Sequence, residues 1–209
     1  MLSISGLSTR LAALNPATGG VYSTADLSVL LERSHPSRLT EAVRLLIREG
    51  VLARVRRGLY ADCLHGYRSE YVGQRWVSPS YLSTETALDR HGLCETGIVP
   101  YTYVTTRILG SRTAARRRLH AHEFVYRHVD SRLFFGYESS DGVLLAHPEK
   151  AALDFLYFCH KGQRSVLSPE DVRFSRLNGL RYRRYLRRYR QRGFSDFALR
   201  WLSRKGGRR

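Results

Sequence analysis

The sequence has few acidic residues, few cysteines and no long apolar run, and each shortage excludes a class of protein. Asp and Glu number 18 against 35 Lys and Arg, which leaves a formal charge of +17. Cys63, Cys94 and Cys159 are widely spaced and form no C-x-x-C pair, which disfavours a disulfide scaffold or a zinc knuckle. No stretch is long enough to span a membrane, and the N-terminal residues do not read as a signal peptide. We expect a cytoplasmic protein that does not associate with membranes.

Sequence signatures of enzymes are also missing. The chain has no G-x-x-x-x-G-K-[ST] and no G-x-G-x-x-G motif for phosphate binding. His120 and His122 would share one face of a strand, but no third metal ligand is evident, which favours surface histidines. Cys159 and His160 are adjacent and cannot face each other on a helix, which weakens a nucleophile–base pair. We predict no enzyme activity, no cofactor and no bound metal.

Positive charge is what the sequence has in excess. Such a charge implies a polyanionic partner, with nucleic acid first and an anionic membrane or acidic protein second. The charge is uneven, because the segment from Arg176 to Arg209 holds twelve arginines and one lysine against a single acid, Asp196. Basic segments of this kind usually contact phosphate or an acidic surface. The apolar fraction of 43% is that of an ordinary globular protein, so a buried core is expected.

Residues 23–61 predict two short helices separated by a tight break, then a hairpin. Ser23 and Asp26 have the spacing of a capping box, and leucines follow on one face of the helix that they open. Pro36 ends this helix, and Ser37 is predicted to cap the next one. The segment VLARVRRGLYA then alternates strand-forming residues around a basic turn.

Helix, turn, helix and hairpin is the order of a winged helix-turn-helix domain, whose second helix enters the major groove of DNA. The second predicted helix ends at Gly50, with apolar residues on one face and arginines on the other. The candidate DNA-binding residues are Ser37, Arg38, Thr40, Arg44 and Arg48 on this helix and Arg54, Arg56 and Arg57 on the hairpin. The alternative is an amphipathic helical pair whose arginines only solvate its surface.

The rest of the chain predicts an α+β fold of two domains, residues 1–66 and 67–209. The second domain is expected to hold an antiparallel sheet with flanking helices and an Arg-rich helical C-terminus. A first helix over residues 4–14 is expected to stop at Asn15-Pro16. Helices are predicted over 67–77, 81–91, 148–158, 180–191 and 194–202, strands over 98–107, 122–129, 132–138 and 143–147, and an exposed basic connection over 112–118. Pro148 suits the first position of its helix, which is expected to be largely buried.

The predicted helix over residues 180–191 carries tyrosines on one side and arginines on the other. The tyrosine stripe fits core packing better than a stacking platform for bases. Six cations on one helix repel one another, and a polyanion would relieve that repulsion. This secondary basic surface consists of Arg181, Arg183, Arg184, Arg187, Arg188 and Arg190.

Four stretches of the chain resemble the AbiEi family of antitoxins from bacterial type IV toxin–antitoxin systems. They are EGVLARVRRGLYA, YLSTETALDRHGL, YVTT and AHPEKAALDFLYF, which follow in the family's order and approximate spacing between Ser23 and His160. The resemblance implies an N-terminal winged helix-turn-helix domain and a mixed α/β antitoxin domain. It also implies double-stranded DNA as a partner, in the form of operator repeats in the protein's own promoter. A co-encoded nucleotidyltransferase-like toxin would be counteracted without a stable complex.

The resemblance extends to particular residues. It assigns Arg38, Thr40, Arg44 and the hairpin arginines to the DNA-reading elements. Pro148, Glu149, Lys150 and Asp154 match the antitoxin-domain signature, where structural roles are expected. The arginine-dense C-terminal stretch departs from the family pattern, which leaves two other readings open. One is a standalone winged-helix regulator, and the other is a basic protein that binds RNA or an acidic protein.

Overall fold

The chain has an α+β fold whose elements gather into two compact units. The computed structural model describes residues 4–30, 32, 35–97, 100–110, 114–163 and 165–203. Contacts divide the chain into unit 1, Met1–Trp76, and unit 2, Val77–Arg209. The domain boundary predicted after residue 66 stays a prediction, because a division by contacts does not show which part folds alone. Within the described ranges, no helix has the length and apolar character needed to cross a bilayer.

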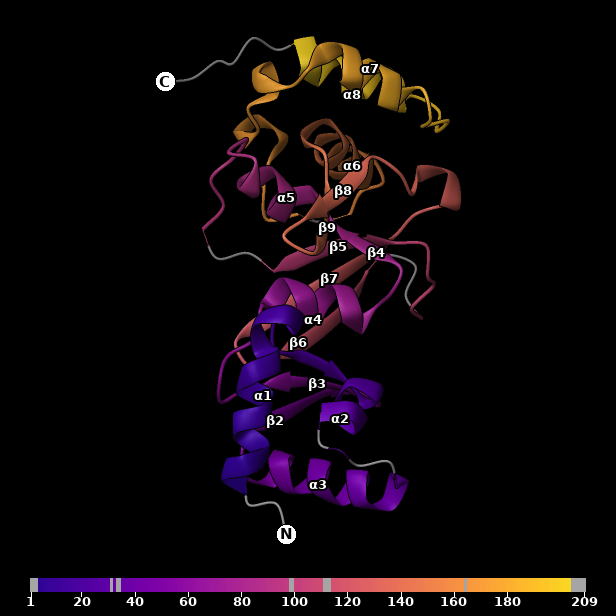
Figure 1. Ribbon diagram of the computed structural model, residues 1–209. Coiled ribbons are helices and arrows are strands. Elements are labelled where there is room, and N and C mark those ends of the chain that lie inside the picture. Colours follow the sequence, from indigo (N-terminus) through magenta and orange to yellow (C-terminus); the bar gives the residue numbers. More distant parts are fainter. Residues whose placement is uncertain are drawn as a thin grey trace. The chain divides into compact units, whose positions relative to one another are not determined.

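Unit 1 combines helices with a small antiparallel sheet (Figure 1). Its elements are α1 (Ile4–Thr18), β1 (Val21–Ser23), α2 (Thr24–Leu30), α3 (Pro36–Arg48), β2 (Leu52–Arg56), β3 (Leu59–Asp62) and α4 (Ser69–Trp76). The strands lie in the order β1-β3-β2. Apolar faces of the first three helices meet at a core that contains Leu7, Leu11, Tyr22, Leu27, Leu39, Ala42, Val43, Leu46, Val51 and Leu52. The apolar face predicted for the helix that ends at Gly50 is therefore confirmed as the buried side of α3.

Helix α1 continues past the point where the sequence predicts its end. The prediction that Asn15-Pro16 stops the helix is wrong, because Pro16 lies inside α1. A proline so near the end of a helix removes only one of the last intrahelical hydrogen bonds. The helix ends instead at Gly19 and Gly20, whose φ angles of +60° and +69° suit glycine.

The start of α2 agrees with the sequence, whereas the start of α3 does not. The Ser23 hydroxyl accepts from the Asp26 amide at 3.1 Å, and the Asp26 carboxylate accepts from the Ser23 amide at 2.7 Å, which confirms the capping box. Ser37 does not cap α3, because His35 precedes the helix and Pro36 occupies its first position. Proline needs no amide partner there, so the Ser37 hydroxyl instead contacts Nδ1 of His35 at 2.7 Å.

The end of α3 leads directly into the β2–β3 hairpin. Gly50 has a φ angle of +71°, and its amide donates to the Ile47 carbonyl while the Val51 amide donates to the Leu46 carbonyl. These two bonds make a Schellman motif, which confirms the predicted helix end. The hairpin also forms as predicted, with its turn at Gly58 and a bulge in β2.

Unit 2 is built on a six-stranded mixed sheet with helices packed on it (Figure 1). Its strands are β4 (Ser80–Leu82), β5 (Tyr101–Thr105), β6 (Ala115–Leu119), β7 (His122–His128), β8 (Tyr137–Ser140) and β9 (Val143–Ala146), in the order β6-β7-β5-β4-β9-β8. Its helices are α5 (Thr84–Arg90), η1 (Ser131–Leu133), α6 (Pro148–His160), η2 (Pro169–Asp171), η3 (Phe174–Arg176), α7 (Gly179–Leu186) and α8 (Phe194–Ser203). The β4–β9 and β5–β7 pairs are parallel, and the other pairs are antiparallel. The prediction of an antiparallel sheet is therefore wrong, because connections through helices and loops bring strands distant in sequence together in parallel.

Two segments of unit 2 are strands that the sequence did not predict. The helix predicted over residues 81–91 begins only at Thr84, because the residues before it form β4. Strand β4 lies inside the sheet and is buried throughout, so it lacks the alternation that marks a half-exposed strand. The basic connection predicted over 112–118 is wrong from Ala115 onward, where β6 forms the sheet edge. Charged side chains on an edge strand prevent its pairing with other chains.

Two further predicted elements are shorter than expected. The strand predicted over residues 132–138 starts at Tyr137, because Asp130 caps the helical turn η1 and Gly136 has a φ of +71°. The helix predicted over 180–191 ends at Leu186, because the chain must reverse direction before α8 packs beside α7. The predicted helix from Pro148 is confirmed as α6, which is buried along almost its whole length.

Candidate nucleic-acid interface

Helix α3 is strongly two-sided, and its arginines point away from the core. Leu39, Val43 and Leu46 are buried, whereas Arg38 and Arg44 are exposed. Burial of this apolar stripe fixes the rotation of the helix about its axis, since a turn in either direction would expose the leucines. The packing of the apolar face therefore determines the direction in which the arginine face of α3 points.

A hollow of about 580 Å³ lies between α3 and the β2–β3 hairpin. Thr40 and Arg44 line it from the helix, and Arg54 and Arg57 line it from the hairpin. We call these four residues and the space between them the helix–hairpin hollow. Four of the eight residues predicted to bind DNA therefore come together around one concave surface of unit 1.

The other four predicted residues do not line the hollow. Arg48 pairs with its neighbour Glu49 at 3.0 Å, and Ser37 contacts His35. Arg56 donates to the Arg75 carbonyl at 3.4 Å and to the Arg57 carbonyl at 3.1 Å. Its guanidinium group is therefore held against backbone carbonyls of the protein itself. Arg38 is exposed on α3 outside the lining of the hollow.

The arginines of the hollow carry unneutralised charge. Among the described residues, no carboxylate lies within ion-pair distance of Arg44, Arg54 or Arg57. Glu41 is exposed on α3 but does not line the hollow. Three cations around one concave surface raise the local positive potential, and an anion that enters gains the attraction of all three.

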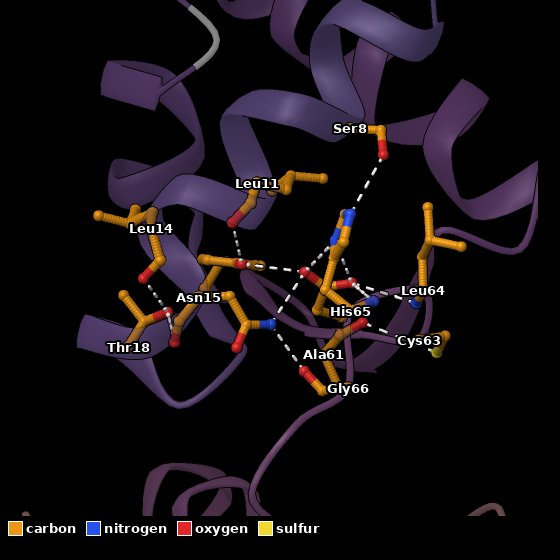
Figure 2. A network of polar contacts seen from close by, with 12 residues as sticks. Ser8, Leu11, Leu14, Asn15, Thr18, Ala61, Cys63, Leu64, His65 and Gly66 are labelled. Atoms are coloured by element: carbon orange, nitrogen blue, oxygen red, sulfur yellow. Dashed lines mark hydrogen bonds and ion pairs between the residues drawn. The ribbon is translucent and has the colours of Figure 1, made fainter.

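A buried carboxylate fixes the hairpin to α1. Asp62, at the end of β3, is fully buried, and its Oδ2 accepts from the Tyr22 hydroxyl at 3.0 Å and from Asn15 Nδ2 at 3.2 Å. Its Oδ1 accepts from the amides of Leu64 and His65 at 3.1 and 2.9 Å. In Figure 2, Asn15 and His65 approach this carboxylate from α1 and from the segment after β3.

No local pattern of residues indicates this network, because its members are scattered over three segments of unit 1. Burial, followed by the charge of Asp62, raises the pKa of the Tyr22 hydroxyl well above its ordinary value of 10.0. Tyr22 therefore stays a hydrogen-bond donor at neutral pH. The network holds the strand that carries the hairpin at a fixed place against α1.

Unit 2 contains a second buried polar cluster, on α6. Lys150 and Asp154 are both fully buried and form an ion pair one helical turn apart. The Asp154 carboxylate also accepts from the hydroxyls of Tyr81, Ser83 and Tyr189, at 2.9, 2.9 and 2.8 Å. Lys150 donates to the Tyr189 hydroxyl at 2.7 Å. This pairing agrees with the structural roles expected for Lys150 and Asp154.

This cluster shows the features of a structural network rather than a reaction centre. Burial lowers the pKa of Lys150, and the neighbouring Asp154 opposes that shift. Burial and Asp154 raise the pKa values of Tyr81 and Tyr189 well above their ordinary range. Each charge is matched by hydrogen bonds, which is the condition for burying an ion pair without a large net cost. The one sequence signal for this cluster is a lysine followed four residues later by an aspartate within an apolar run.

The secondary basic surface forms on α7 and the residues that follow it. All six of its arginines are exposed. The tyrosine side packs inward as predicted, since Tyr182 and Tyr189 are buried. Arg181 lies 3.7 Å from the buried Glu149, whose other oxygen accepts from the Asn178 amide at the start of α7. Glu149 therefore stabilises the docking of α7 on α6.

The histidines and cysteines do not form a reactive site among the residues described. His120 lies in a turn with a φ of +50°, so the prediction that it shares a strand face with His122 is wrong. No group of three or more metal-ligating side chains occurs in the described ranges. Burial raises the pKa of Cys94 to about 12 and that of Cys159 to about 11, which keeps both thiols protonated at neutral pH.

A scan against models of known protein families finds no match to the chain, and a search of curated proteins finds none either. The likeness to AbiEi antitoxins therefore rests on the four stretches quoted from the sequence.

Proposed function

We propose that the chain is a DNA-binding antitoxin that represses its own operon. The observation that carries the DNA-binding part is the helix–hairpin hollow, where Arg44 of α3 and Arg54 and Arg57 of the hairpin line one concave surface. Double-stranded DNA carries one negative charge per about 1.7 Å of its axis, so it matches such a cationic concavity.

The order of the elements in unit 1 supports a winged-helix reading. Helix, strand, two helices and a hairpin follow one another, and the first strand joins the sheet beside the last. In winged helix-turn-helix proteins the helix before the hairpin enters the major groove, which is about 12 Å wide and admits a helix. In this proposal α3 is the reading helix and the hairpin is the wing.

The arginines then divide into two roles. Arg38 and Arg44 on α3 reach base edges, where a bidentate arginine reads guanine. Arg54 and Arg57 on the hairpin bind phosphates and set the register of the protein on the duplex. Arg48 and Arg56 contribute less, because each already donates to a protein acceptor.

Fluorescence anisotropy with a duplex from the protein's own promoter tests this proposal. Replacing Arg54 and Arg57 by alanine is expected to weaken binding, and to flatten the slope of log affinity against log salt by about one per lost phosphate contact. Replacing Arg44 by alanine is expected to cost about 1–3 kcal/mol on the operator and much less on an unrelated duplex.

The matched control is Arg117→Ala/Arg118→Ala for the double variant and Arg118→Ala alone for Arg44→Ala, because each removes an equal charge from exposed positions on β6 of unit 2. The effect of each control should be small and the same on both duplexes. If Arg54→Ala/Arg57→Ala leaves both affinity and salt slope at the level of its control, the hairpin does not bind DNA. If Arg44→Ala weakens the two duplexes equally, α3 does not read sequence.

The antitoxin part of the proposal rests on the resemblance to AbiEi antitoxins. It is tested by expressing the chain together with the nucleotidyltransferase-like protein encoded beside it. We expect growth arrest by that protein to be relieved, without the two proteins purifying as a complex. The absence of such a neighbouring gene, with operator binding intact, would instead favour a standalone regulator.

A further inference from the structure

The arginines of the α7 surface are not all in the same environment. Arg188 lies over the ring of Phe135, with Cζ 4.2 Å from the ring centre, and Arg184 lies over the ring of Tyr185 at 5.5 Å. We call these two arginines and two rings the arginine platform. Arg183 and Arg187, on the same segment, are exposed and have no ring contact among the described residues.

Both rings of the platform contact residues at or near the start of α6. Lys150 Nζ lies 4.8 Å from the centre of the Phe135 ring. The Tyr185 hydroxyl lies 2.8 Å from Nδ1 of His147, the residue before α6, and its ring meets Phe135 edge to face at 5.2 Å. The rings are therefore fixed before any ligand arrives, which lowers the entropic cost of binding.

Arg184 and Arg188 are both exposed, so a ligand can reach their guanidinium groups where they lie over Tyr185 and Phe135. Unpaired nucleic-acid bases stack on guanidinium planes and aromatic rings, whereas the bases of a duplex already stack on one another. The neighbouring arginines supply charge for the phosphates between such bases.

We propose that the arginine platform binds single-stranded nucleic acid, with bases stacked on Arg184 and Arg188 and phosphates paired with Arg183 and Arg187. This site is separate from the helix–hairpin hollow and does not depend on the proposed repression of an operon. The shared ligand chemistry is an unpaired base on a phosphate backbone, so both RNA and single-stranded DNA carry it.

The test compares charge-preserving variants of the full-length chain. Arg184→Lys/Arg188→Lys keeps both positive charges but removes the planar groups that lie on the rings. Arg183→Lys/Arg187→Lys is the matched control, because it makes the same change at two arginines without ring contacts. Both variants affect exposed side chains, and thermal unfolding checks that each folds as the parent does.

Binding is measured by fluorescence anisotropy with three labelled ligands of equal length. They are 20-nucleotide oligo(A) RNA, the same sequence in single-stranded DNA, and a duplex. We expect the platform variant to lose at least about fivefold in affinity for the single strands. The control variant should lose little, and the salt slope should be unchanged in both because the charge is unchanged. Tighter binding of RNA than of DNA would identify RNA as the ligand.

Three results would overturn the proposal. Equal losses in the two variants would mean that the surface acts through charge alone. A loss confined to the duplex would make the surface an extension of duplex binding. Competition by poly-L-glutamate as strong as that by oligo(A), at equal charge concentration, would indicate an acidic protein as the partner instead.

Discussion

The chain carries two cationic surfaces that differ in what lies beneath the arginines. On unit 1, the arginines of the helix–hairpin hollow extend from α3 and the hairpin around an open concavity, with an apolar core behind the helix. On unit 2, Arg184 of α7 and Arg188 just after it lie over aromatic rings; the Phe135 ring lies against the buried Lys150, and Tyr185 contacts His147. Positive charge is thus displayed in two geometries.

In our two proposals, the residues that support a cationic surface, rather than its charge, determine which nucleic acid it binds. An open concavity of arginines matches the curved, regularly spaced phosphates of a duplex. Exposed arginines that lie over aromatic rings offer planar groups for stacking, which unpaired bases can use. Substitutions in the buried residues that support each surface should therefore show how strongly that surface depends on its support.

The largest expected effect is the loss of the ion pair beneath the arginine platform. Asp154→Asn leaves the charge of Lys150 buried without a partner, which we expect to cost about 3–5 kcal/mol in the free energy of unfolding of unit 2. Urea unfolding followed by circular dichroism measures this loss. Lys150→Met/Asp154→Leu removes both charges together and should cost clearly less, so equal costs would contradict the ion-pair account.

The corresponding change in unit 1 should be smaller. Asp62→Ala removes the acceptor for the amides of Leu64 and His65 and for the Tyr22 hydroxyl, and we expect a loss of about 2–3 kcal/mol. The same variant should weaken duplex binding, because the strand that carries the hairpin loses its attachment to α1. Unchanged duplex affinity in the folded variant would show that the hairpin does not depend on this network.

High pH should separate the two units. Burial raises the pKa values of four tyrosines in unit 2 and of one tyrosine, Tyr22, in the described part of unit 1. The four in unit 2 are Tyr81, Tyr126, Tyr182 and Tyr189. A tyrosine whose pKa is raised in the folded state contributes stability that is fully present below pH 10. Above pH 10 this contribution is lost by about 1.4 kcal/mol per pH unit for each such tyrosine. The lowered pKa of Lys150 acts in the opposite direction, but only below its ordinary value of 10.5.

Unit 2 is therefore expected to unfold first as the pH rises above about 10.5. Trp201 lies in unit 2 and Trp76 in unit 1, so the fluorescence of Trp76→Phe and Trp201→Phe variants reports each unit by itself. Tyrosinate absorbance should rise over the same pH range in which the fluorescence of Trp201 changes. Earlier loss of the Trp76 signal would contradict the assignment of most buried tyrosines to unit 2.

The smallest expected effect concerns the junction of α3 with the hairpin. Gly50→Ala forces a side chain into a φ of +71°, although the new Cβ would meet no other atom within 4 Å. The cost should therefore be conformational alone, about 1 kcal/mol, and visible as a lower midpoint of thermal unfolding. Gly162→Ala, with a φ of +70° and an equally open site in unit 2, is the matched control for the effect on duplex binding.

Local chemistry in unit 1 could be predicted well from the sequence. The capping box at Ser23, the helix end at Gly50 and the hairpin turn at Gly58 each depend on a few adjacent residues, and all three are present. Two errors are local as well, because Pro16 lies inside α1 and Ser37 does not cap α3. The other errors concern distant partners, since β4 and β6 form by pairing with other strands.

The candidate sites show the same limit. The side of α3 that carries Arg44 follows from the periodicity of its leucines, so it could be predicted. The turn of Arg56 toward the Arg75 carbonyl and the position of Arg188 over Phe135 depend on segments far apart in the sequence. No local pattern reports such contacts, because the residues meet only after the chain has folded.

The central claim is that the two arginine surfaces fit different forms of nucleic acid. The most direct test measures promoter duplex and oligo(A) RNA against two variants, Arg44→Ala/Arg57→Ala and Arg184→Lys/Arg188→Lys, by anisotropy at one salt concentration. We predict that the first variant weakens duplex binding and changes RNA binding little, and that the second does the reverse. If both variants weaken both ligands in the same proportion, the chain has one undifferentiated polyanion surface and the claim is wrong.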